Sequence, residues 1–384
     1  MRIIYCTDTI CHHGGIQRTT IAKANALAEV DGYEVWIVVT DHKLSKPILE
    51  VSDKVHIIDL DINYYEDDWK SRWHVLKGIL VKRRLHRKRL KDLLTKIHPD
   101  VVISTGTSEK YFLPGLKLDS TPAFIREIHY TSDYRIRSAR GWFEILSAWA
   151  GDLIDYRFSI NRYDKIVVLT REDKEAHWKG NNKVVTIPNP LSNSHGYQSS
   201  LTNKIVISAG RFVPVKDFSS LIQSWATVHE RHSEWRLEIW GDGGLRKTLQ
   251  EEIKGRDLEG CVSLPGYADD ILQKFAEASI FVCSSQYEGF SLSILEAMSC
   301  GLPVVSFACP YGPREMIQDG ENGFLVPVGD AVGLADSIIR MIEDESLRYQ
   351  MGHAAKAFSE KYDIDIILGK WRSLFLEITD NKRR

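Results

Sequence analysis

The chain has 384 residues, of which 43% are hydrophobic, 10% aromatic and 27% charged. This composition is that of an ordinary globular protein and excludes collagen-like, disordered and disulfide-scaffold classes, and the length predicts two domains. Fifty Lys and Arg against 52 Asp and Glu give a formal charge of −2. The chain as a whole therefore has no general attraction for nucleic acid or for an anionic membrane.

Short β-rich apolar runs alternate with amphipathic helical patterns, which predicts parallel sheets flanked by helices. Strands are predicted at 2–6, 34–39, 55–58, 101–104, 123–127, 165–169 and 184–187, and then at 205–208, 235–240, 262–264, 280–283, 303–306 and 324–326. The segment from Pro188 to Asn203 is rich in Pro, Ser and Asn and predicts a linker. A final helix is predicted from Tyr362 to Thr379.

The six cysteines are scattered without Cys-x-x-Cys spacing, which predicts reduced thiols and argues against a disulfide framework or a structural zinc site. The first residues show no signal-peptide pattern. No apolar run reaches the roughly 18 residues of a membrane span. We therefore expect a cytoplasmic location.

The stretch around Glu288 carries the strongest chemical signal. A buried strand, a glycine-bearing turn and a helix follow one another, and such a helix directs unpaired N–H groups at a phosphate. Glu288 lies in the turn and Glu296 about 12 Å further along the helix, at about 1.5 Å per residue. These carboxylates suit hydroxyls at opposite ends of a nucleotide sugar, with the diphosphate over the amides of Phe290 and Ser291. The alternative is a solvated glutamate at each position.

Two cations form a second constellation. Arg211 and Lys216 flank a turn at the carboxyl end of a predicted strand, where open α/β sheets bind ligands. Fixed cations there suit the charge that develops on a departing diphosphate. Pairing of either with a surface carboxylate is the alternative. Gly14 and Gly15 precede a predicted helix and allow close approach of a ligand, without the full glycine fingerprint of a nicotinamide enzyme.

Together these segments resemble the GT-B glycosyltransferases of family 4, which are retaining enzymes that use nucleotide-sugar donors. The matching segments are Gly14-Gly15, Glu127-Ile128-His129-Tyr130, Gly210-Arg211 with Lys216, Leu264-Pro265-Gly266-Tyr267, Tyr287-Glu288-Gly289-Phe290 through Glu296, Gly301-Leu302-Pro303-Val304-Val305 and Asp319-Gly320-Glu321-Asn322-Gly323-Phe324-Leu325-Val326. The resemblance spans the chain and is dense from about 205 to 330.

The resemblance implies an α/β fold with two facing Rossmann-like domains and a nucleotide-sugar site in the cleft. The acceptor-side domain would be 1–190, with the helix at about 362–384 packed back on it, and the donor domain 204–361. By resemblance, Arg211 and Lys216 bind the diphosphate, Glu288 the sugar hydroxyls and Glu296 the ribose. Backbone at Gly266 and Tyr267 meets the base, Gly14 and Gly15 lie at the phosphates, and His129 lies beside the transferred sugar. A hydrogen-bonded interior histidine is the alternative for His129.

The loop Cys309-Pro310-Tyr311-Gly312-Pro313-Arg314-Glu315 resembles the version of a family motif found in bacterial surface-polysaccharide and teichoic-acid-type transferases. It departs from the commoner Gly-Gly-x-x-Glu form, so Arg314 either adds a ligand contact or serves as a cap or salt bridge. No cofactor and no metal are expected, because the cations and the helix amides supply the electrostatic work. The Asp-x-Asp at Asp59 and Asp61 lies far from the donor half.

The segment from Trp69 to Leu94 has the pattern of a basic interfacial helix. Between Lys70 and Lys91 there are ten Lys or Arg and no Asp or Glu, which predicts contact of Trp69 to Lys91 with an anionic membrane surface. A solvated face or nucleic-acid contact is the alternative. For a second stripe, at Trp142, Ile145, Leu146, Trp149 and Leu153, we expect core packing.

The function that follows is transfer of a hexose or N-acetylhexosamine, with retention, from a nucleotide diphosphate sugar. Uridine is the expected base by resemblance, and the acceptor is a lipid-linked or growing glycan of a bacterial surface polysaccharide such as lipopolysaccharide, capsule or exopolysaccharide. The enzyme would lie on the inner face of the membrane. The alternatives are a nucleotide-sugar epimerase of the same architecture, a non-catalytic membrane-bound partner subunit, and a nicotinamide dehydrogenase, against which the incomplete glycine fingerprint argues.

Overall fold

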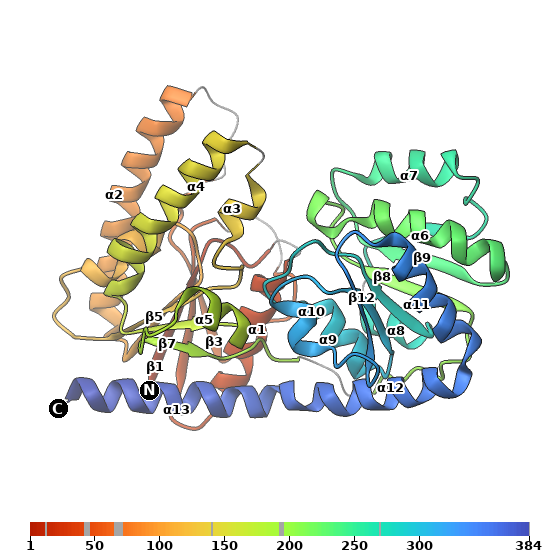
Figure 1. Ribbon diagram of the computed structural model, residues 1–384. Helices are drawn as coiled ribbons and strands as arrows, with labels where there is room; N and C mark the ends of the chain where they lie inside the picture. Colours follow the sequence, from red (N-terminus) through yellow and green to blue (C-terminus); the bar gives the residue numbers. More distant parts are fainter. Residues whose placement is uncertain are drawn as a thin grey trace. The chain divides into compact units, whose positions relative to one another are not determined.

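A computed structural model of the protein describes residues 1–11, 14–41, 47–64, 72–139, 141–191, 196–268 and 270–383. The chain divides into two compact units (Figure 1). The first comprises Met1–Leu169, Asp173–Pro190 and Ile364–Arg384. The second comprises Thr170–Glu172 and Leu191–Asp363.

The first unit holds a parallel sheet of seven strands in the order β3-β2-β1-β4-β5-β6-β7. Its strands are β1 (Arg2–Thr7), β2 (Glu34–Val39), β3 (Val55–Asp59), β4 (Val101–Ser104), β5 (Ala123–Glu127), β6 (Lys165–Val168) and β7 (Val184–Thr186). Its helices are α1 (Gly15–Ala28), α2 (Arg72–Ile97), α3 (Tyr134–Ser138), α4 (Trp142–Ile154), most of α5 (Arg171–His177), and α13 (Ile364–Arg383).

Side chains that alternate along β1 pack into separate cores on the two faces of the sheet. Ile3 and Tyr5 pack with apolar residues of α1 and α13. Ile4 and Cys6 pack on the opposite face with Leu90 of α2 and its neighbours. Because the central strands β1 and β4 are buried on both faces, they are nearly continuous apolar runs in the sequence.

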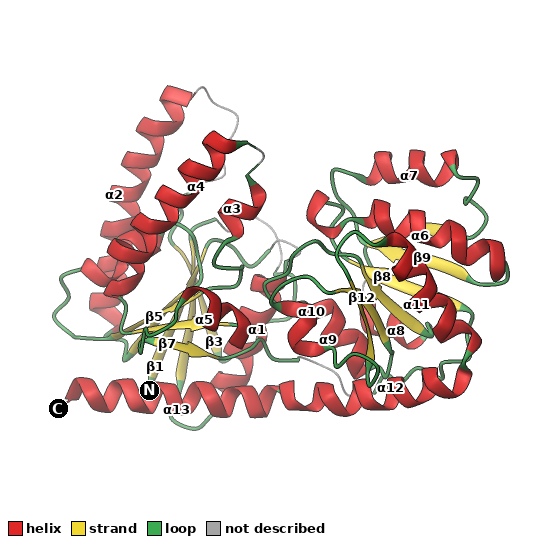
Figure 2. Ribbon diagram, in the orientation of Figure 1, coloured by secondary structure: helices red, strands yellow, loops and turns green. Residues whose placement is uncertain are grey.

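The second unit holds a parallel sheet of six strands in the order β10-β9-β8-β11-β12-β13. Its strands are β8 (Ile205–Ala209), β9 (Arg236–Trp240), β10 (Val262–Gly266), β11 (Ile280–Cys283), β12 (Val304–Phe307) and β13 (Gly323–Val326). Its helices are α6 (Phe218–Arg231), α7 (Arg246–Gly255), α8 (Ile271–Ala276), α9 (Leu292–Ser299), α10 (Gly312–Met316), α11 (Ala331–Glu343) and α12 (Glu345–Ser359). The sheet lies between these helices (Figure 2).

The prediction of parallel sheets flanked by helices is confirmed, and every strand predicted from the sequence is present within two residues. The segment predicted as a linker, Pro188 to Asn203, is divided between the units: it belongs to the first unit up to Pro190 and to the second unit from Leu191. Ser199 and Leu201 are buried there, and the Ser199 hydroxyl donates to the Ala278 carbonyl. All six cysteines are free. None of the described helices combines the length and the apolar character that crossing a bilayer requires.

Candidate active site

Lys216 and Glu288 form an ion pair at the carboxyl edge of the second sheet. The strand order makes β8 and β11 the neighbours from which the connections run in opposite directions, and open α/β sheets bind ligands outside the strand ends at such a point. Lys216 follows β8 and Glu288 follows β11, and Lys216 Nζ lies 2.6 Å from Glu288 Oε1. The two side chains are 21% and 11% exposed. The fold therefore brings together two residues that the sequence analysis singled out separately.

Neighbouring groups hold this pair in place. The Ser285 hydroxyl donates to Glu288 Oε1 at 2.6 Å, and the Ser284 hydroxyl donates to the Lys216 carbonyl at 2.8 Å. A Cβ on Gly210 would lie 3.3 Å from Lys216 Cε, so the glycine makes room for the lysine stem. Burial lowers the pKa of Lys216, but Glu288 and other neighbours raise it more, and the net pKa lies above the ordinary value. The ammonium is therefore charged at neutral pH.

Arg211 lies in the same segment, and its side chain is exposed. Within the described ranges its guanidinium has neither a hydrogen bond nor an ion pair. The pairing with a surface carboxylate that the sequence left open is therefore absent for Arg211 among these residues. For Lys216 the partner is Glu288, itself a candidate site residue.

Helix α9 starts directly after the Glu288 turn, with Ser291 as its N-cap. Leu295 N donates to the Ser291 carbonyl at 3.2 Å, which leaves the first amides of the helix without intrahelical partners. Glu296 lies in the second turn and is 6% exposed. The Phe290 ring is buried against Tyr362, with 5.7 Å between centroids, so its side chain has a packing role.

The loop before α10 is joined to the Glu288 turn. Tyr311 and Glu288 form an isolated parallel bridge, and Tyr311 has φ of 75°, which is unfavourable for a residue with a side chain. A Cβ on Gly312 would lie 3.0 Å from Glu288 Cβ and 3.2 Å from Ser291 N. A side chain at this position would therefore crowd Glu288 and the start of α9.

Arg314 takes the salt-bridge role, which was one of its two predicted roles. Its guanidinium pairs with Glu172, whose other oxygen accepts from Tyr311 N at 2.8 Å. Glu315 accepts from Arg171 N at 2.8 Å. Glu172 and Arg171 belong to the short segment that groups with the second unit.

The sequence analysis missed a glycine-rich turn that lies between two of its predicted segments. Gly241 N donates to the Gly266 carbonyl at 2.7 Å, and a Cβ on Gly241 would lie 2.0 Å from the Gly210 oxygen. Gly266 has φ of 102°, and Tyr267 after it is 52% exposed. The signal available in the sequence was Gly-Asp-Gly-Gly directly after the strand that ends at Trp240. This turn connects the Arg211 segment to the Gly266 segment.

The remaining candidates, Gly14, Gly15 and His129, belong to the first unit. Gly14 is the N-cap of α1 and Gly15 begins the helix. The His129 side chain is 3% exposed, with Nε2 3.3 Å from Glu127 Oε1, and Glu127 also pairs with buried Lys23. Neither ring nitrogen of His129 makes a hydrogen bond of good geometry among the described residues.

The Glu127 carboxylate at the centre of this group is charged. Burial raises its pKa, but Lys23 and His129 lower it more, to about 2. Sequence reasoning did not single out Lys23 or Glu127. A lysine in the apolar pattern of α1 and a glutamate at the end of an apolar strand were the available signals.

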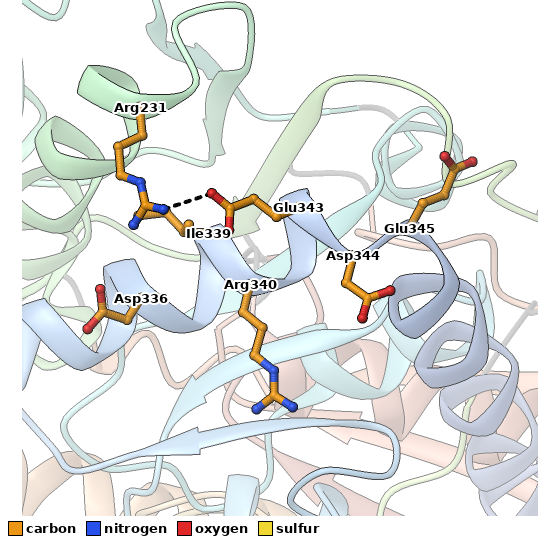
Figure 3. Close-up of a pocket in the computed structure, with 7 residues that line it drawn as sticks. All are labelled: Arg231, Asp336, Ile339, Arg340, Glu343, Asp344 and Glu345. Carbon is orange, nitrogen blue, oxygen red and sulfur yellow. Dashed lines mark hydrogen bonds and ion pairs between the residues drawn. The ribbon is translucent and has the colours of Figure 1, made fainter.

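A hollow of about 500 Å³ lies elsewhere in the second unit (Figure 3). It is lined by Arg231, Asp336, Ile339, Arg340, Glu343, Asp344 and Glu345. Arg231 already pairs with Glu343 at 2.8 Å. The hollow contains none of the candidate residues, so it does not mark the candidate site. Within the described ranges no cluster of three or more His, Cys, Asp or Glu is arranged to hold a metal ion.

In the comparison with known proteins, the family match falls in the second unit. The sequence profile described as "Glycosyl transferases group 1" matches residues 193–358. An exopolysaccharide phosphotransferase of Streptomyces coelicolor is 30% identical over 89% of this chain and 34% of its own length. An uncharacterized glycosyltransferase of Haemophilus influenzae is 26% identical over 94% of this chain and 96% of its own length. A poly(ribitol-phosphate) α-N-acetylglucosaminyltransferase of Staphylococcus aureus is 32% identical over 50% of this chain and 39% of its own length.

The chain thus spans about a third of the Streptomyces relative and most of the Haemophilus one. Among solved structures, Staphylococcus aureus TarM in complex with UDP and α-GlcNAc-glycerol aligns with a TM-score of 0.76 and 17% identity, over 97% of this chain and 99% of that one. This likeness confirms the GT-B fold. The second unit of the chain, in which the matched residues 193–358 lie, belongs to the group 1 glycosyltransferases, family 4.

Proposed function

We propose that this glycosyltransferase moves a hexose or N-acetylhexosamine from UDP, with retention, to a lipid-linked or growing glycan in the synthesis of a bacterial surface polysaccharide. The observation that carries the proposal is the Lys216–Glu288 pair, with Nζ and Oε1 2.6 Å apart. The pair lies at the ends of β8 and β11, the neighbouring strands from which the connections run in opposite directions. A cation and a carboxylate at one ligand edge suit a diphosphate and the hydroxyls of its sugar.

Each candidate residue takes one part of the donor. Lys216 and Arg211 bind the diphosphate, and Glu288 orients the sugar hydroxyls. Glu296 holds the ribose, the α9 amides at Phe290 and Ser291 face the phosphates, and the backbone at Gly266 and Tyr267 meets the base. Gly14, Gly15 and His129 supply the contacts of the first unit, His129 at the transferred sugar.

The reaction breaks the bond between the anomeric carbon and the diphosphate oxygen and forms a bond from the acceptor oxygen to the same face of that carbon. The departing diphosphate takes the acceptor proton. Its negative charge grows as the bond breaks, so the preformed cations Lys216 and Arg211 stabilise the transition state more than the ground state.

The acceptor class and the location are inferred from charge and from the relatives. Two of the relatives are named for exopolysaccharide and poly(ribitol-phosphate) chemistry. Within the block from Trp69 to Lys91, Arg84, Arg87, Lys88 and Lys91 are exposed in α2, whereas Trp69 and Lys70 lie outside the described residues. Each exposed cation near an anionic surface contributes about 1 kcal/mol. We place the enzyme at the inner face of the membrane on this ground.

The first test is thermal stabilisation by UDP-, GDP-, ADP- and CMP-sugars, with and without magnesium. A donor at about 100 times its Kd adds about 2.7 kcal/mol to the free energy of unfolding. We expect stabilisation by a UDP-sugar alone that does not need magnesium. If none of these nucleotide sugars stabilises the protein, the result would favour the alternative of a non-catalytic partner subunit.

The nucleotide released then identifies the reaction. Glycosyl transfer releases UDP when an acceptor is present, whereas transfer of a sugar phosphate would release UMP. An epimerase would convert the donor with no acceptor added. UMP as the main product, or sugar conversion without an acceptor, would contradict the proposal.

A further inference from the structure

Helix α4 carries an apolar surface that its own unit does not cover. The exposed side chains are Trp142 at 74%, Phe143 at 72%, Ile145 at 44%, Leu146 at 55%, Trp149 at 58% and Leu153 at 49%. A helix in water normally turns its apolar side to a core, so a surface of this size marks an interaction site. The prediction of core packing for this stripe is wrong, because its spacing fits any apolar surrounding and the unit supplies none.

Ion pairs fix α4 at its C-terminal end. Asp155, the C-cap, pairs with Lys110 Nζ at 2.7 Å and with Arg135 at 2.6 Å, and Asp152 pairs with Arg135 at 3.1 Å. Lys110 and Asp155 are 5% and 7% exposed. The exposed surface thus belongs to a helix with a buried anchor.

The same anchor brings α4 close to the basic helix α2. Lys110 Nζ and the Arg83 guanidinium of α2 each lie 4.7 Å from the centroid of the Tyr111 ring. The residues Glu109–Tyr111 therefore contact both helices, through Arg83 on one side and Asp155 on the other. In Figure 1, α2 and α4 both extend from the first sheet on the side away from α13.

The charges near this surface favour one occupant. From Lys70 to Lys91 no acidic residue occurs, and Arg84, Arg87, Lys88 and Lys91 are exposed. On α2 itself, Leu80 and Val81 are also exposed, at 61% and 65%. Exposed aromatic and aliphatic side chains beside clustered cations are the composition of an interfacial membrane element.

We propose that α4 inserts its Trp142, Phe143 and Trp149 side chains into the boundary between the headgroups and acyl chains of an anionic bilayer, while α2 binds the headgroups. The inference deepens the proposed function, since a lipid-linked acceptor would meet the enzyme at that surface. Charge alone would give binding that salt removes. Apolar insertion adds a component that persists in salt, so the two helices supply two separable signals.

The test is flotation of the full chain with phosphatidylglycerol–phosphatidylcholine vesicles at low salt and at about 0.5 M salt, where the Debye length is only a few ångströms. The variant is Trp142→Ser, Phe143→Ser and Trp149→Ser together. The control is Val332→Ser, Ile366→Ser and Leu376→Ser, which removes three side chains that are 70%, 50% and 53% exposed on other helices. We expect the α4 variant to lose binding by about tenfold or more at both salt levels, and the control to bind like the unmodified chain.

A second measurement does not depend on a variant's fold. Lipids brominated on their acyl chains should quench the tryptophan fluorescence of the unmodified chain. Absence of quenching, or undiminished flotation of the α4 variant, would overturn the inference. So would a dimer of the unmodified chain that the α4 variant disperses without losing vesicle binding, because the surface would then join two copies.

Donor chemistry separates this inference from the proposed function. Both triple variants should retain stabilisation by UDP-sugar, because none of the six positions lies at Lys216 or Glu288. If UDP release fails while flotation depends on α4, the proposed function fails and the membrane inference stands. If UDP is released and the α4 variant floats with vesicles as well as the unmodified chain does, the proposed function stands and the membrane inference fails.

Discussion

At the residue scale, Lys216 and Glu288 neutralise one another in a partly buried setting, so each stabilises the charge of the other. In the proposed function both side chains also contact the donor. Lys216→Ala and Glu288→Ala are each expected to lower turnover by about tenfold or more, because a preformed charge at the diphosphate or sugar is lost. UDP release by purified variants measures this effect.

A matched control separates catalysis from folding in that experiment. Lys204→Ala removes an exposed pair with Glu234, 3.4 Å apart, with side chains 57% and 49% exposed. It should leave turnover unchanged, because exposed pairs contribute little. Loss of the cooperative circular-dichroism melt in Lys216→Ala or Glu288→Ala would instead assign the pair a structural role.

Glu109 makes the stability of the first unit depend on pH. Burial and the Asp8 carboxylate raise its pKa to about 7, although Arg126 opposes the shift. Because the folded pKa lies above the ordinary 4.5, the contribution of Glu109 to stability is complete below pH 4.5 and is lost as the pH rises through 7. Glu109→Gln should therefore raise the free energy of unfolding at pH 8 by on the order of 3 kcal/mol, at about 1.4 kcal/mol per pKa unit.

Urea unfolding at pH 4.5, 6 and 8 measures this difference. The variant and the unmodified chain should agree most closely at the lowest pH and diverge as the pH rises. Parallel curves across the range would show that Glu109 is already ionised at little cost in the folded chain.

The sequence predicted Lys216 and Glu288 as separate candidates, because each follows an apolar run and a turn. It did not predict that they pair, because they lie 72 positions apart and the sequence does not show the strand order that makes β8 and β11 neighbours. The buried Lys23–Glu127 pair was missed for a related reason. A charged residue inside an apolar pattern argues against burial of that position unless its oppositely charged partner is known, and the sequence does not show which residue is the partner.

At the element scale, α13 completes the core of the first unit from the far end of the sequence. Trp371 and Phe375 are fully buried there, and Lys23 Nζ lies 4.7 Å from the centroid of the Trp371 ring. Trp371→Ala should lower the free energy of unfolding by about 3–5 kcal/mol, because it leaves a large cavity beside a buried ion pair. Leu376→Ala on the same helix, where the side chain is 53% exposed, should change stability by far less. Equal losses from both variants in urea unfolding would contradict this account of α13.

The strands could be predicted because parallel strands buried on both faces leave uninterrupted apolar runs. Helix α4 shows where the same logic stops. Its apolar spacing indicates a surface that packs against something but does not distinguish the protein core from an external partner, and only its exposure in the fold excludes the core. The Gly241 turn was missed because the need for glycine there comes from close approach to the Gly210 backbone, which is near in space but distant in sequence.

At the scale of the whole molecule, the donor candidates Arg211, Lys216, Glu288 and Glu296 all belong to one unit with its own sheet and core. A fragment from Leu191 to Asp363 should therefore fold cooperatively and retain stabilisation by UDP. Its affinity should be lower than that of the full chain, because the contacts proposed for Gly14, Gly15 and His129 are absent.

The fragment also lacks Glu172, so Tyr311 N and Arg314 lose the carboxylate that holds the loop beside Glu288. If that loop matters for the donor, extending the fragment at its N-terminus to include Thr170–Glu172 should recover part of the lost affinity. Thermal shift against UDP compares the two fragments, and Glu172→Ala in the longer one is the matched control. A fragment that folds but gives no UDP response in either form would show that the first unit supplies a required part of the donor site, which Lys216 and Glu288 alone do not replace.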